Sequence, residues 1–341
     1  MKSIILVGGM GTRLRPLTYE TPKQMLPLVG VPMIHCVFEM LAHHGVTDAV
    51  LALGYLPDHF IEAYPTNVIA GVRVTYAVEP EPLDTAGAIR FAAKFAQFDE
   101  TFLVINGDVL TDLNVTRLVD FHRAHGAAAT IALHPVEDPS RYGVVPTTDD
   151  GQVIAFVEKP SREDAPTNLI NAGTYVFEPS VLELIAPTGR VSVERDTFPA
   201  LAASGTLYAM ADDSYWLDTG TPRTYLQANV DILLGRKTQA HSSEVVDGSW
   251  RSASATIDPT ATLIRSVVDE NCVIGPDVVI EDSVLLPGAV VQRGCEVRSS
   301  ILGHEAVIGS YSRLGATCVV GAKVHVAPLS ELSGDVRLGG V

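Results

Sequence analysis

The 341-residue chain has little of what marks three common classes of protein. Its four cysteines show no paired CxxC spacing, so they indicate neither a zinc site nor a disulfide framework: Cys36, Cys272, Cys295 and Cys318. No stretch approaches the roughly 18 consecutive apolar residues of a membrane-spanning helix, and the N-terminal apolar run is too short for a signal peptide. We therefore expect small buried cysteines and a soluble cytoplasmic protein with no membrane partner.

Positive charge is also scarce. The chain has 24 Lys and Arg against 40 Asp and Glu, a formal net charge of −16. This excess of negative charge disfavours nucleic acid as a partner, because its phosphates are anionic too. An anionic substrate must instead meet cations that are concentrated locally. With 47% hydrophobic residues, the chain is long enough for one large domain and a smaller one.

The stretch from Ile4 to Pro27, IILVGGMGTRLRPLTYETPKQMLP, carries the strongest functional signal. Its first four residues are all apolar, which predicts a buried parallel strand. Arg13 and Lys23 supply positive charge that suits a polyphosphate. Between the strand and these cations lie glycines whose backbone N–H groups can approach a ligand without a Cβ in the way: Gly8, Gly9 and Gly11. The stretch therefore predicts a phosphate-binding loop.

Two better-known glycine motifs do not fit this loop. The dinucleotide-binding fingerprint needs a third glycine where this chain has Leu14. The P-loop needs Gly-Lys-Ser/Thr, whereas Gly11 is followed by Thr12 and Arg13.

Apolar periodicity in the first two thirds of the chain predicts alternating strands and helices. Such alternation favours a doubly wound, Rossmann-like α/β sheet with ligands beyond the carboxyl ends of its strands, where both the glycine loop and Asp108 lie. Strands then predominate from 128 to 177, so we expect a mixed or antiparallel extension that covers one side of a nucleotide crevice. The expected helices are 33–44, 58–63, 85–95, 181–185, 194–203 and 223–234, and the expected strands are 50–53, 72–78, 101–105, 130–133, 142–145, 153–157, 169–177 and 207–210.

The last third of the chain repeats with a period of six residues. Aliphatic residues recur at that interval, each of the first four is followed by another aliphatic, and the repeat resumes after a one-residue slip: Val267, Val273, Val279, Leu285, Val291 and Val297, then Leu302, Ile308, Leu314, Val320 and Val326. Six is the step of a left-handed parallel β-helix built from hexapeptide repeats. We predict a catalytic domain at 1–235, a polar linker at 236–255 and a β-helix domain at 256–341.

Two aspartates that follow apolar runs are candidate metal ligands. Asp108 comes after Asn106-Gly107, and Asp218 lies in the sequence WLDTGTP. Mg²⁺ prefers one or two carboxylates together with phosphate oxygens of a substrate. Either aspartate alone would more often be a turn or loop residue, but together with the glycine loop they predict a Mg²⁺ site.

These segments, with EPEPLDTAGA at 79–88 and FVEKP at 156–160, resemble the sugar-nucleotide pyrophosphorylases, which join a nucleoside triphosphate (NTP) to a sugar 1-phosphate. The resemblance covers nearly the whole chain. Within that family GGMGTRLRPLT, the TAG segment and VERDTFP look most like the mannose-1-phosphate guanylyltransferases. The resemblance implies that a sugar 1-phosphate, preferably mannose 1-phosphate, attacks the α-phosphorus of GTP in line, giving NDP-sugar and pyrophosphate.

The resemblance also implies roles for individual residues. It makes Arg13, Lys23, Asp108, Lys159 and Asp218 catalytic, with Mg²⁺ held by Asp108 and Asp218. The residues implied to bind nucleotide are Leu6, Gly8, Gly9, Gly11, Thr12, Arg13, Lys23, Glu79, Pro80, Thr85, Ala86, Gly87, Asn106 and Gly107. Those implied to bind the sugar phosphate are Tyr142, Gly143, Glu158, Lys159, Asn171, Thr174 and Glu194.

One position departs from the family pattern. The family usually has Leu-Gly-Thr-Ala-Gly where this chain has Leu83-Asp84-Thr85-Ala86-Gly87. Asp tolerates a positive φ better than most residues, but it adds a negative charge near the expected nucleotide. The base specificity therefore stays open at this point.

Several alternatives remain beside this reading. The nucleotide is dTTP or UTP in the first alternative, with glucose 1-phosphate or a cyclitol phosphate as acceptor. A second is acyl transfer, for which His304 and His325 in the β-helix are the candidate bases. A third is a regulatory or scaffold relative of the enzymes. In each case the exposed faces and open end of a β-helix lead us to expect a homo-oligomer.

Overall fold

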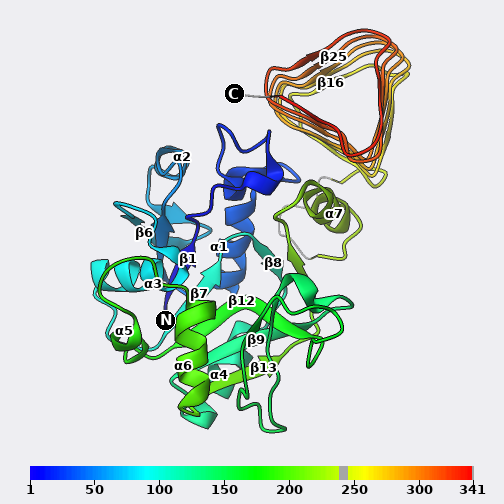
Figure 1. Cartoon of the computed structure of the whole chain (residues 1–341). Coiled ribbons are helices and arrows are strands. Elements are labelled where there is room, and N and C mark those ends of the chain that lie inside the picture. Colours follow the sequence, from blue (N-terminus) through cyan, green and yellow to red (C-terminus); the bar gives the residue numbers. More distant parts are fainter. Residues whose placement is uncertain (238–244, 340–341) are drawn as a thin grey trace. The chain divides into compact units, whose positions relative to one another are not determined.

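The chain divides into two units, each built from segments far apart in the sequence. One unit comprises Met1–Gly9 with Val37–Trp216, and the other Met10–Cys36 with Leu217–Val341. The computed structural model describes residues 1–237 and 245–339 (Figure 1). Within these residues no helix is both long and apolar enough to cross a membrane. All four cysteines are buried and free, as predicted.

The first unit is built on a mixed sheet whose centre is parallel. Strand β1 pairs with β4 on one side and β7 on the other, and β4 pairs with β6, all in parallel register. The apolar run that precedes the glycine loop is buried on both faces, which is why it occupies a central position. The strands are β1 (Lys2–Leu6), β4 (Asp48–Leu53), β6 (Val72–Val78) and β7 (Phe102–Asn106), with β5 (Val68–Ile69) antiparallel at the edge.

Beyond β7 the sheet becomes largely antiparallel, which confirms the expected mixed sheet. Strand β12 pairs antiparallel with β7, β9 and β10, and β13 returns parallel to β9. The predicted strand 153–157 is mostly wrong, because only its last residue lies in β11, and Val153 makes an isolated bridge to Thr147. The strands are β9 (Ala129–Pro135), β10 (Gly143–Val144), β11 (Val157–Glu158), β12 (Leu169–Phe177) and β13 (Leu207–Ala211).

Helices α3 and α6 bury their apolar faces in one hydrophobic core with β1, β4, β7, β9 and β12. The predicted helix 194–203 is two elements, a π-helical turn η4 (Val193–Thr197) followed by α6 (Phe198–Ala203). Helix α4 was not predicted; Asn114 caps its first turn and Gly126, at φ 57°, ends it. The other elements are α2 (Asp58–Ala63), α3 (Asp84–Phe95), β8 (Val109–Thr111), α4 (Val115–His125), η3 (Pro139–Arg141) and α5 (Val181–Leu184).

The second unit joins the loop segment 10–36 to the C-terminal third of the chain. Asn229 of helix α7 accepts from the Val29 N–H at 3.0 Å, and the Tyr225 hydroxyl donates to the Pro27 carbonyl. A capping box of Thr221 and Thr224 begins α7. The elements are η1 (Thr12–Leu14), η2 (Lys23–Met25), β2 (Pro27–Leu28), β3 (Val31–Pro32), α1 (Met33–His43, which runs on into the first unit), β14 (Trp216–Asp218) and α7 (Pro222–Leu233).

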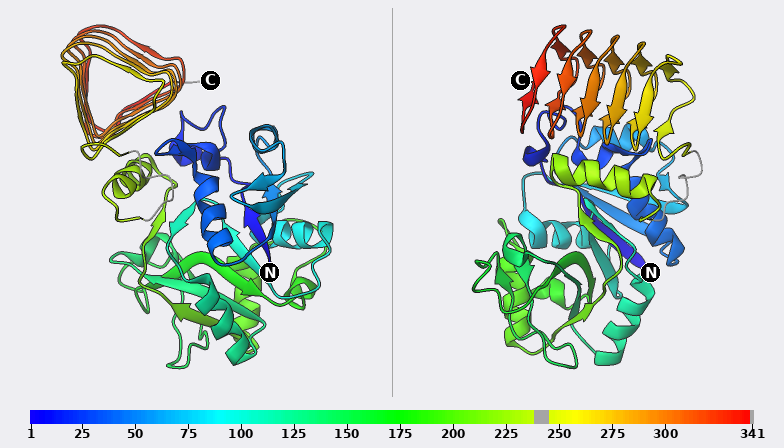
Figure 2. Two further views of the ribbon diagram at one scale, coloured as in Figure 1. Left: turned by 180° about the vertical axis from the view of Figure 1, so that it is seen from behind. Right: turned by 90° about the vertical axis from the view of Figure 1, so that its right-hand side faces the viewer.

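The C-terminal third folds as a three-faced parallel β-helix, here called the prism (Figures 1 and 2). Its three faces are the sheets β15-β18-β21-β24-β27-β30, β16-β19-β22-β25-β28 and β17-β20-β23-β26-β29, all with parallel pairing. The strands are β15 (Trp250–Arg251), β16 (Thr256–Ile257), β17 (Thr262–Ile264), β18 (Val267–Val268), β19 (Val273–Ile274), β20 (Val279–Glu281), β21 (Val284–Leu285), β22 (Val290–Val291), β23 (Glu296–Arg298), β24 (Ile301–Leu302), β25 (Val307–Ile308), β26 (Arg313–Leu314), β27 (Val319–Val320), β28 (His325–Val326), β29 (Glu331–Leu332) and β30 (Arg337–Leu338).

The predicted register of the prism was wrong by one residue in its first repeats. Val268, Ile274 and Ile280 lie in the core, whereas Val273 is 43% exposed. Leu285 pairs with Val268 and Leu302 with Leu285, so a coil there has 17 residues and the six-residue step shortens to five twice. The paired aliphatics of these repeats concealed the register, because either member fits a six-residue period.

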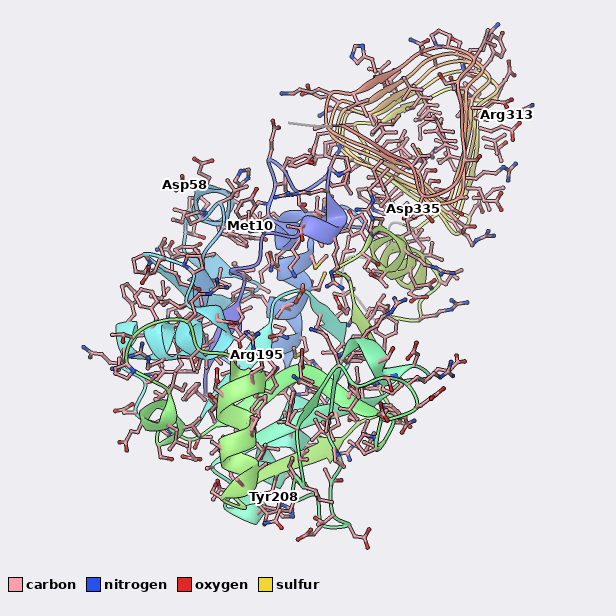
Figure 3. The ribbon with its side chains drawn as sticks, viewed as in Figure 1. Met10, Asp58, Arg195, Tyr208, Arg313 and Asp335 are labelled. Atoms are coloured by element: carbon pink, nitrogen blue, oxygen red, sulfur yellow. The ribbon has the colours of Figure 1, made fainter. Side chains whose placement is uncertain are left out.

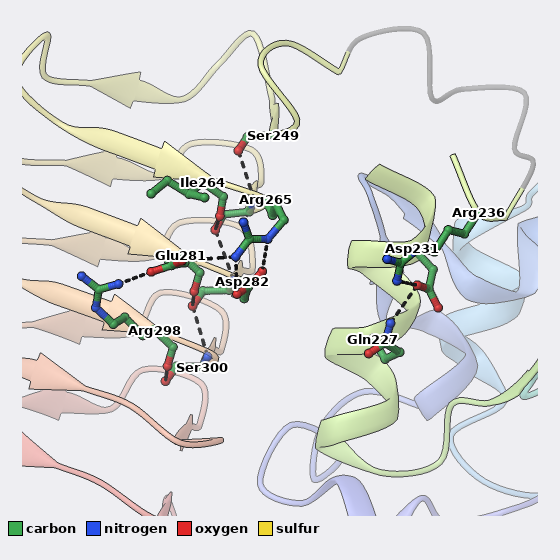
Figure 4. A network of polar contacts seen from close by, with 12 residues as sticks. Gln227, Asp231, Arg236, Ser249, Ile264, Arg265, Glu281, Asp282, Arg298 and Ser300 are labelled. Atoms are coloured by element: carbon green, nitrogen blue, oxygen red, sulfur yellow. Dashed lines mark hydrogen bonds and ion pairs between the residues drawn. The ribbon is translucent and has the colours of Figure 1, made fainter. Parts of the chain in front are cut away.

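A buried serine ladder and an ion-pair network connect successive coils (Figure 4). The Ser266 hydroxyl accepts from the Ser283 N–H, and the Ser283 hydroxyl accepts from the Ser300 N–H. On an outer face Arg265 bonds to Glu281 and Asp282 of the next coil. Both sets satisfy polar groups between coils, where an unpaired group would destabilise the stack.

The predicted linker at 236–255 lies partly outside the described residues, at 238–244. Trp250–Arg251 forms the first strand of the prism and pairs with β18. The domain boundaries remain predictions.

Candidate active site

The strand ends of the first unit bring together several residues predicted to bind nucleotide. The Gly107 N–H donates to the Leu6 carbonyl at 3.0 Å. A Cβ at Gly107 would lie 2.6 Å from a methyl group of Val7, so only glycine fits. A Cβ at Gly8 would lie 3.3 Å from the Glu79 carboxylate. Leu6, Gly8, Glu79 and Gly107 therefore lie together at the end of β1, with Gly107 buried behind the loop.

Glu79 is held in place by the segment that leads into helix α3. Its Oε2 accepts from the Leu83 N–H at 3.1 Å. Burial raises the pKa of the Glu79 carboxyl, and this hydrogen bond opposes the shift. Pro80, its predicted partner along the base, is exposed.

Thr85 and Glu194 are directly bonded, although they were predicted to bind different parts of the substrate pair. The Thr85 hydroxyl donates to Glu194 Oε2 at 2.8 Å and accepts from the Val193 N–H at 2.8 Å. The Ser192 hydroxyl donates to the same Glu194 oxygen at 2.8 Å. Hydrogen bonds thus connect the predicted base-binding and sugar-binding segments. One carboxylate oxygen of Glu194 accepts two of them.

Ala86 and Gly87 are also committed to this connection. Both of their N–H groups donate to the carbonyl of Val191, at 2.9 and 3.2 Å. A Cβ at Gly87 would lie 2.9 Å from Leu83 Cβ. The glycine at position 87 is therefore required by Leu83, at the start of helix α3.

Asp84, which replaces the usual family glycine, has a cationic partner. Its backbone φ is +62°, and its Oδ2 accepts from Arg195 Nη2 at 2.8 Å. The side chains are 22% and 67% exposed for Asp84 and Arg195, which is labelled in Figure 3. The added negative charge is compensated within the same unit, so it does not by itself oppose nucleotide binding.

The predicted sugar-phosphate residues on β10 and β11 lie across from each other. Gly143 pairs with Glu158, and the Lys159 N–H donates to the Tyr142 carbonyl at 3.1 Å. Lys159 Nζ lies 2.8 Å from Glu158 Oε1, with side chains 63% and 32% exposed. A pair this exposed is weak, so a bound phosphate can replace the carboxylate as the partner of Lys159.

Asn171 is hydrogen-bonded within β12 to Tyr175, a residue that the sequence analysis does not place in the site. Its Nδ2 donates to the Tyr175 hydroxyl at 3.0 Å, and its Oδ1 accepts from the Gly173 N–H at 3.0 Å. Burial raises the pKa of Tyr175, and the nearby carboxylates of Glu194, Glu158 and Asp108 add to that shift. Asn171 is therefore the partner that fixes the Tyr175 hydroxyl, while the charges of the three predicted site carboxylates act on it.

Thr174 differs from its neighbours in this strand. It is 1% exposed, and its hydroxyl is buried with no hydrogen-bond partner in the described part of the chain. A Cβ at the adjacent Gly173 would lie 2.7 Å from Asn106 Nδ2, so the glycine leaves room for Asn106.

In the second unit Gly11 forms the base of the loop that carries Arg13. Gly11 has φ +61°, and its carbonyl accepts from the Leu14 N–H at 2.9 Å and the Thr18 hydroxyl at 2.8 Å. A Cβ at Gly11 would lie 3.2 Å from Lys23 Cβ. The tight loop thus brings the stem of Lys23 against Gly11. Thr12 opens the short η1 turn and is exposed, as is Gly9 in the first unit.

Arg13 and Asp218 form an ion pair that was not foreseen from the sequence. Arg13 Nη2 lies 3.6 Å from Asp218 Oδ2, with side chains 61% and 22% exposed. Asp218 Oδ1 accepts from the Gly220 N–H at 2.8 Å. A side chain at Gly220 would collide with the Arg13 guanidinium, which explains the glycine.

The two candidate metal ligands belong to different units, Asp108 to the first and Asp218 to the second. Both offer carboxylate oxygens, the donors that Mg²⁺ prefers. In residues 1–237 and 245–339 no group of three or more His, Cys, Asp and Glu side chains is placed to hold a metal ion. Each carboxylate by itself suits a cation whose other ligands are phosphate oxygens, and their joint binding of one ion stays a prediction.

A family model described as "Nucleotidyl transferase" matches residues 2–234. The chain belongs to the nucleotidyltransferase family. A second model, "EIF2B subunit epsilon LbH domain", matches residues 224–332. Together these matches confirm the predicted family and fold class.

Relatives match over most of their length. The chain is 38% identical to "Mannose-1-phosphate guanylyltransferase" of Mycobacterium tuberculosis, over 86% of this chain and 82% of that protein. It is 39% identical to "Mannose-1-phosphate guanyltransferase" of Schizosaccharomyces pombe, over 96% and 92%. A crystal structure of HddC from Yersinia pseudotuberculosis complexed with GMP-PN has a TM-score of 0.58 and 31% identity, covering 67% of this chain and 97% of that one.

Proposed function

We propose that this nucleotidyltransferase joins GTP to mannose 1-phosphate, giving GDP-mannose and pyrophosphate. The observation that carries the proposal is its identity of 38% and 39% to proteins named for this activity, over a span that includes the prism. The guanine nucleotide in the HddC complex supports the choice of base. The Arg195 partner of Asp84 supports it further, because it removes the objection of an uncompensated charge.

In the proposed mechanism the protein positions two anionic substrates and neutralises the charge of the transition state. Arg13 and Lys23 act on the NTP phosphates, while Lys159 leaves Glu158 to pair with the phosphate of mannose 1-phosphate. The Glu158 carboxylate accepts hydrogen bonds from sugar hydroxyls, and the Asn171 amide forms hydrogen bonds with the sugar ring. An acceptor phosphate oxygen then attacks the α-phosphorus in line, and no covalent nucleophile of the protein is needed.

The proposal includes a divalent metal ion, which members of this family generally use. We assign Asp108 and Asp218 as its protein ligands and Mg²⁺ as the metal. When bound, the ion would neutralise charge on the phosphate oxygens. The Arg13–Asp218 pair is exposed enough to exchange, so an arriving triphosphate can draw Arg13 to itself and leave Asp218 for the metal.

A matrix of NTPs against sugar 1-phosphates, read by pyrophosphate release, tests the proposal. We expect GTP with mannose 1-phosphate to give the highest kcat/KM, activity to vanish in EDTA, and Mg²⁺ to restore it. A higher kcat/KM for dTTP or UTP with glucose 1-phosphate or a cyclitol phosphate would establish the alternative specificity. No release from any pair would favour a regulatory or scaffold relative. The predicted homo-oligomer is checked separately, by light scattering on the full chain.

A further inference from the structure

One edge of the prism runs along the loop segment 10–36. At the first coil, the Trp250 ring packs so closely on Gly30 that a Cβ there would collide with it. At the other end, Cβ atoms at Gly321, after β27, and at Gly339, after β30 in the last coil, would lie 3.1 and 3.2 Å from the Pro16 ring. The sheet between these contacts has six strands, so five spacings of about 4.8 Å separate its ends, roughly 24 Å. The loop segment is therefore anchored at both ends of the prism.

The contacts at the last coil involve the part of the loop that carries Arg13. Arg337, in β30, donates from Nη1 to the Arg13 carbonyl at 2.7 Å and to the Arg15 carbonyl at 3.1 Å. Hydrogen bonds from a guanidinium to carbonyls are charge-assisted and stronger than neutral ones. Two such bonds from one rigid group fix both the position and the direction of the peptides between them.

The glycines beside Arg337 support the same contact. The backbone of Gly339 has φ +126°, a conformation that by itself favours glycine. The backbone of Gly321 has no such positive φ, so its conformation does not require glycine. At Gly321 the requirement is spatial, since a Cβ would lie 3.0 Å from the Leu338 carbonyl and 3.1 Å from Pro16. The corresponding positions after β18 and β21 are Asp269 and Leu286. The one after β24 is also a glycine, Gly303, which the backbone of the next coil requires, so only the distances to Pro16 bear on the loop.

A further loop residue lies near this edge. Burial lowers the pKa of His304, in the coil before Gly321, and the negative charge of Glu20 opposes that shift. Glu20 belongs to the loop segment, so its charge acts on this edge of the prism together with that of Glu305.

We propose that the last coil of the prism fixes the backbone conformation of the predicted phosphate-binding loop. Arg337 is then the positioning residue for Arg13. The inference rests on the proposed function and extends it to a residue that contacts no substrate. The backbone of Arg13 is fixed by Arg337, and its guanidinium is steadied by Asp218. Transfer that depends on placed charges is sensitive to small displacements, so releasing this backbone should weaken catalysis.

Three variants of the full chain test the inference kinetically. Arg337→Ala should lower kcat/KM for the NTP about tenfold, the loss expected for charge-assisted hydrogen bonds. The KM for the sugar 1-phosphate should stay unchanged, because Arg13 acts on the NTP. Arg337→Lys should recover part of the loss. The matched control is Arg313→Ala, since Arg313 lies on the outside of the prism and forms long ion pairs to Glu296 and Glu331, at 3.5 and 3.9 Å (Figure 3).

A second readout does not require activity. Amide hydrogen exchange in substrate-free protein should become faster in peptides covering residues 11–19 in Arg337→Ala, and not in Arg313→Ala. Wild-type kinetics and exchange in Arg337→Ala would overturn the inference. So would an equal rise of both KM values together with a lower Tm, which indicates general destabilisation. If the wild type releases no pyrophosphate from any pair, the proposed function fails, and the exchange experiment still decides whether Arg337 holds the loop.

Discussion

The two units hold their predicted site residues in different ways. In the first unit the predicted binding residues are bonded to one another, as Thr85 is to Glu194 and Asn171 is to Tyr175. In the second unit the Arg13 backbone is held by Arg337, 324 residues away in the sequence. The first arrangement joins residues within one α/β unit. The second depends on a repeat structure that lies outside the matched "Nucleotidyl transferase" segment.

This difference indicates where each part of the site is vulnerable. Substitutions of the predicted binding residues in the first unit act on groups that we assign to substrate binding. Such substitutions should therefore alter substrate binding directly. The loop of the second unit should in addition respond to changes in the last coil. The predictions below separate these two kinds of effect.

The largest effect is expected from the cations of the loop. Arg13→Ala and Lys23→Ala should each lower kcat about 100-fold or more, because each removes a positive charge that stabilises the phosphates in the transition state. Steady-state pyrophosphate release measures this. Arg117→Ala is the control in the first unit, since Arg117 is 67% exposed and lies 3.9 Å from Asp212. Turnover within a few-fold of wild type in both loop variants would refute the phosphate-loop assignment.

An intermediate effect is expected from the Asp84–Arg195 pair. Arg195→Ala leaves the Asp84 carboxylate without its cation and should raise the KM for GTP about threefold, in keeping with an exposed ion pair. Asp84→Gly restores the usual family residue at a positive φ. The double variant should therefore match Asp84→Gly alone. A double-mutant cycle on KM measures the coupling, and strictly additive effects would show that the pair does not affect the nucleotide site.

The smallest effect concerns the stability of the prism. Asp269 is buried, and burial raises the pKa of its carboxyl from 3.8 to about 6. Its charged form is disfavoured in the folded state, so the folded protein loses stability as the pH rises from about 4 to 6 and does not regain it above. Asp269→Asn should stabilise the protein by roughly 1 to 2 kcal/mol at pH 8 and by less at pH 4.5. Thermal melts at both pH values measure this, with exposed Asp277→Asn as the control; an equal gain at both would contradict the ionisation argument.

The sequence predicted most of the elements, because apolar periodicity is a local property. It predicted α2 and β12 at their observed bounds, and the six-residue period led to the prism. The register of the first coils failed where two adjacent aliphatics fitted equally well. Helix α4 was overlooked, although Val115, Leu118 and Val119 have helical spacing and are buried.

The individual site residues were suggested by motifs, but their partners were not. Arg195 lies next to Glu194 in the segment VERDTFP. Nothing in the nearby sequence indicates its ion pair with Asp84, which is 111 residues away. Tyr175 directly follows the predicted site residue Thr174, but nothing in the nearby sequence shows that its hydroxyl meets Asn171. Arg337 resembles any polar residue on the outside of a repeat. Such pairings depend on the tertiary fold, so a single sequence contains no local signal for them.

The two anchors of the loop segment, Trp250 at the first coil and Arg337 at the last, also bear on how this β-helix can evolve. Repeat arrays commonly gain or lose whole repeats, because each repeat contacts only its neighbours. Here one extra coil between the anchors would move Arg337 by about 4.8 Å from the carbonyls it now reaches. Contacts with the loop segment 10–36 thus constrain the number of coils, so the length of the prism must match the distance between the two anchors.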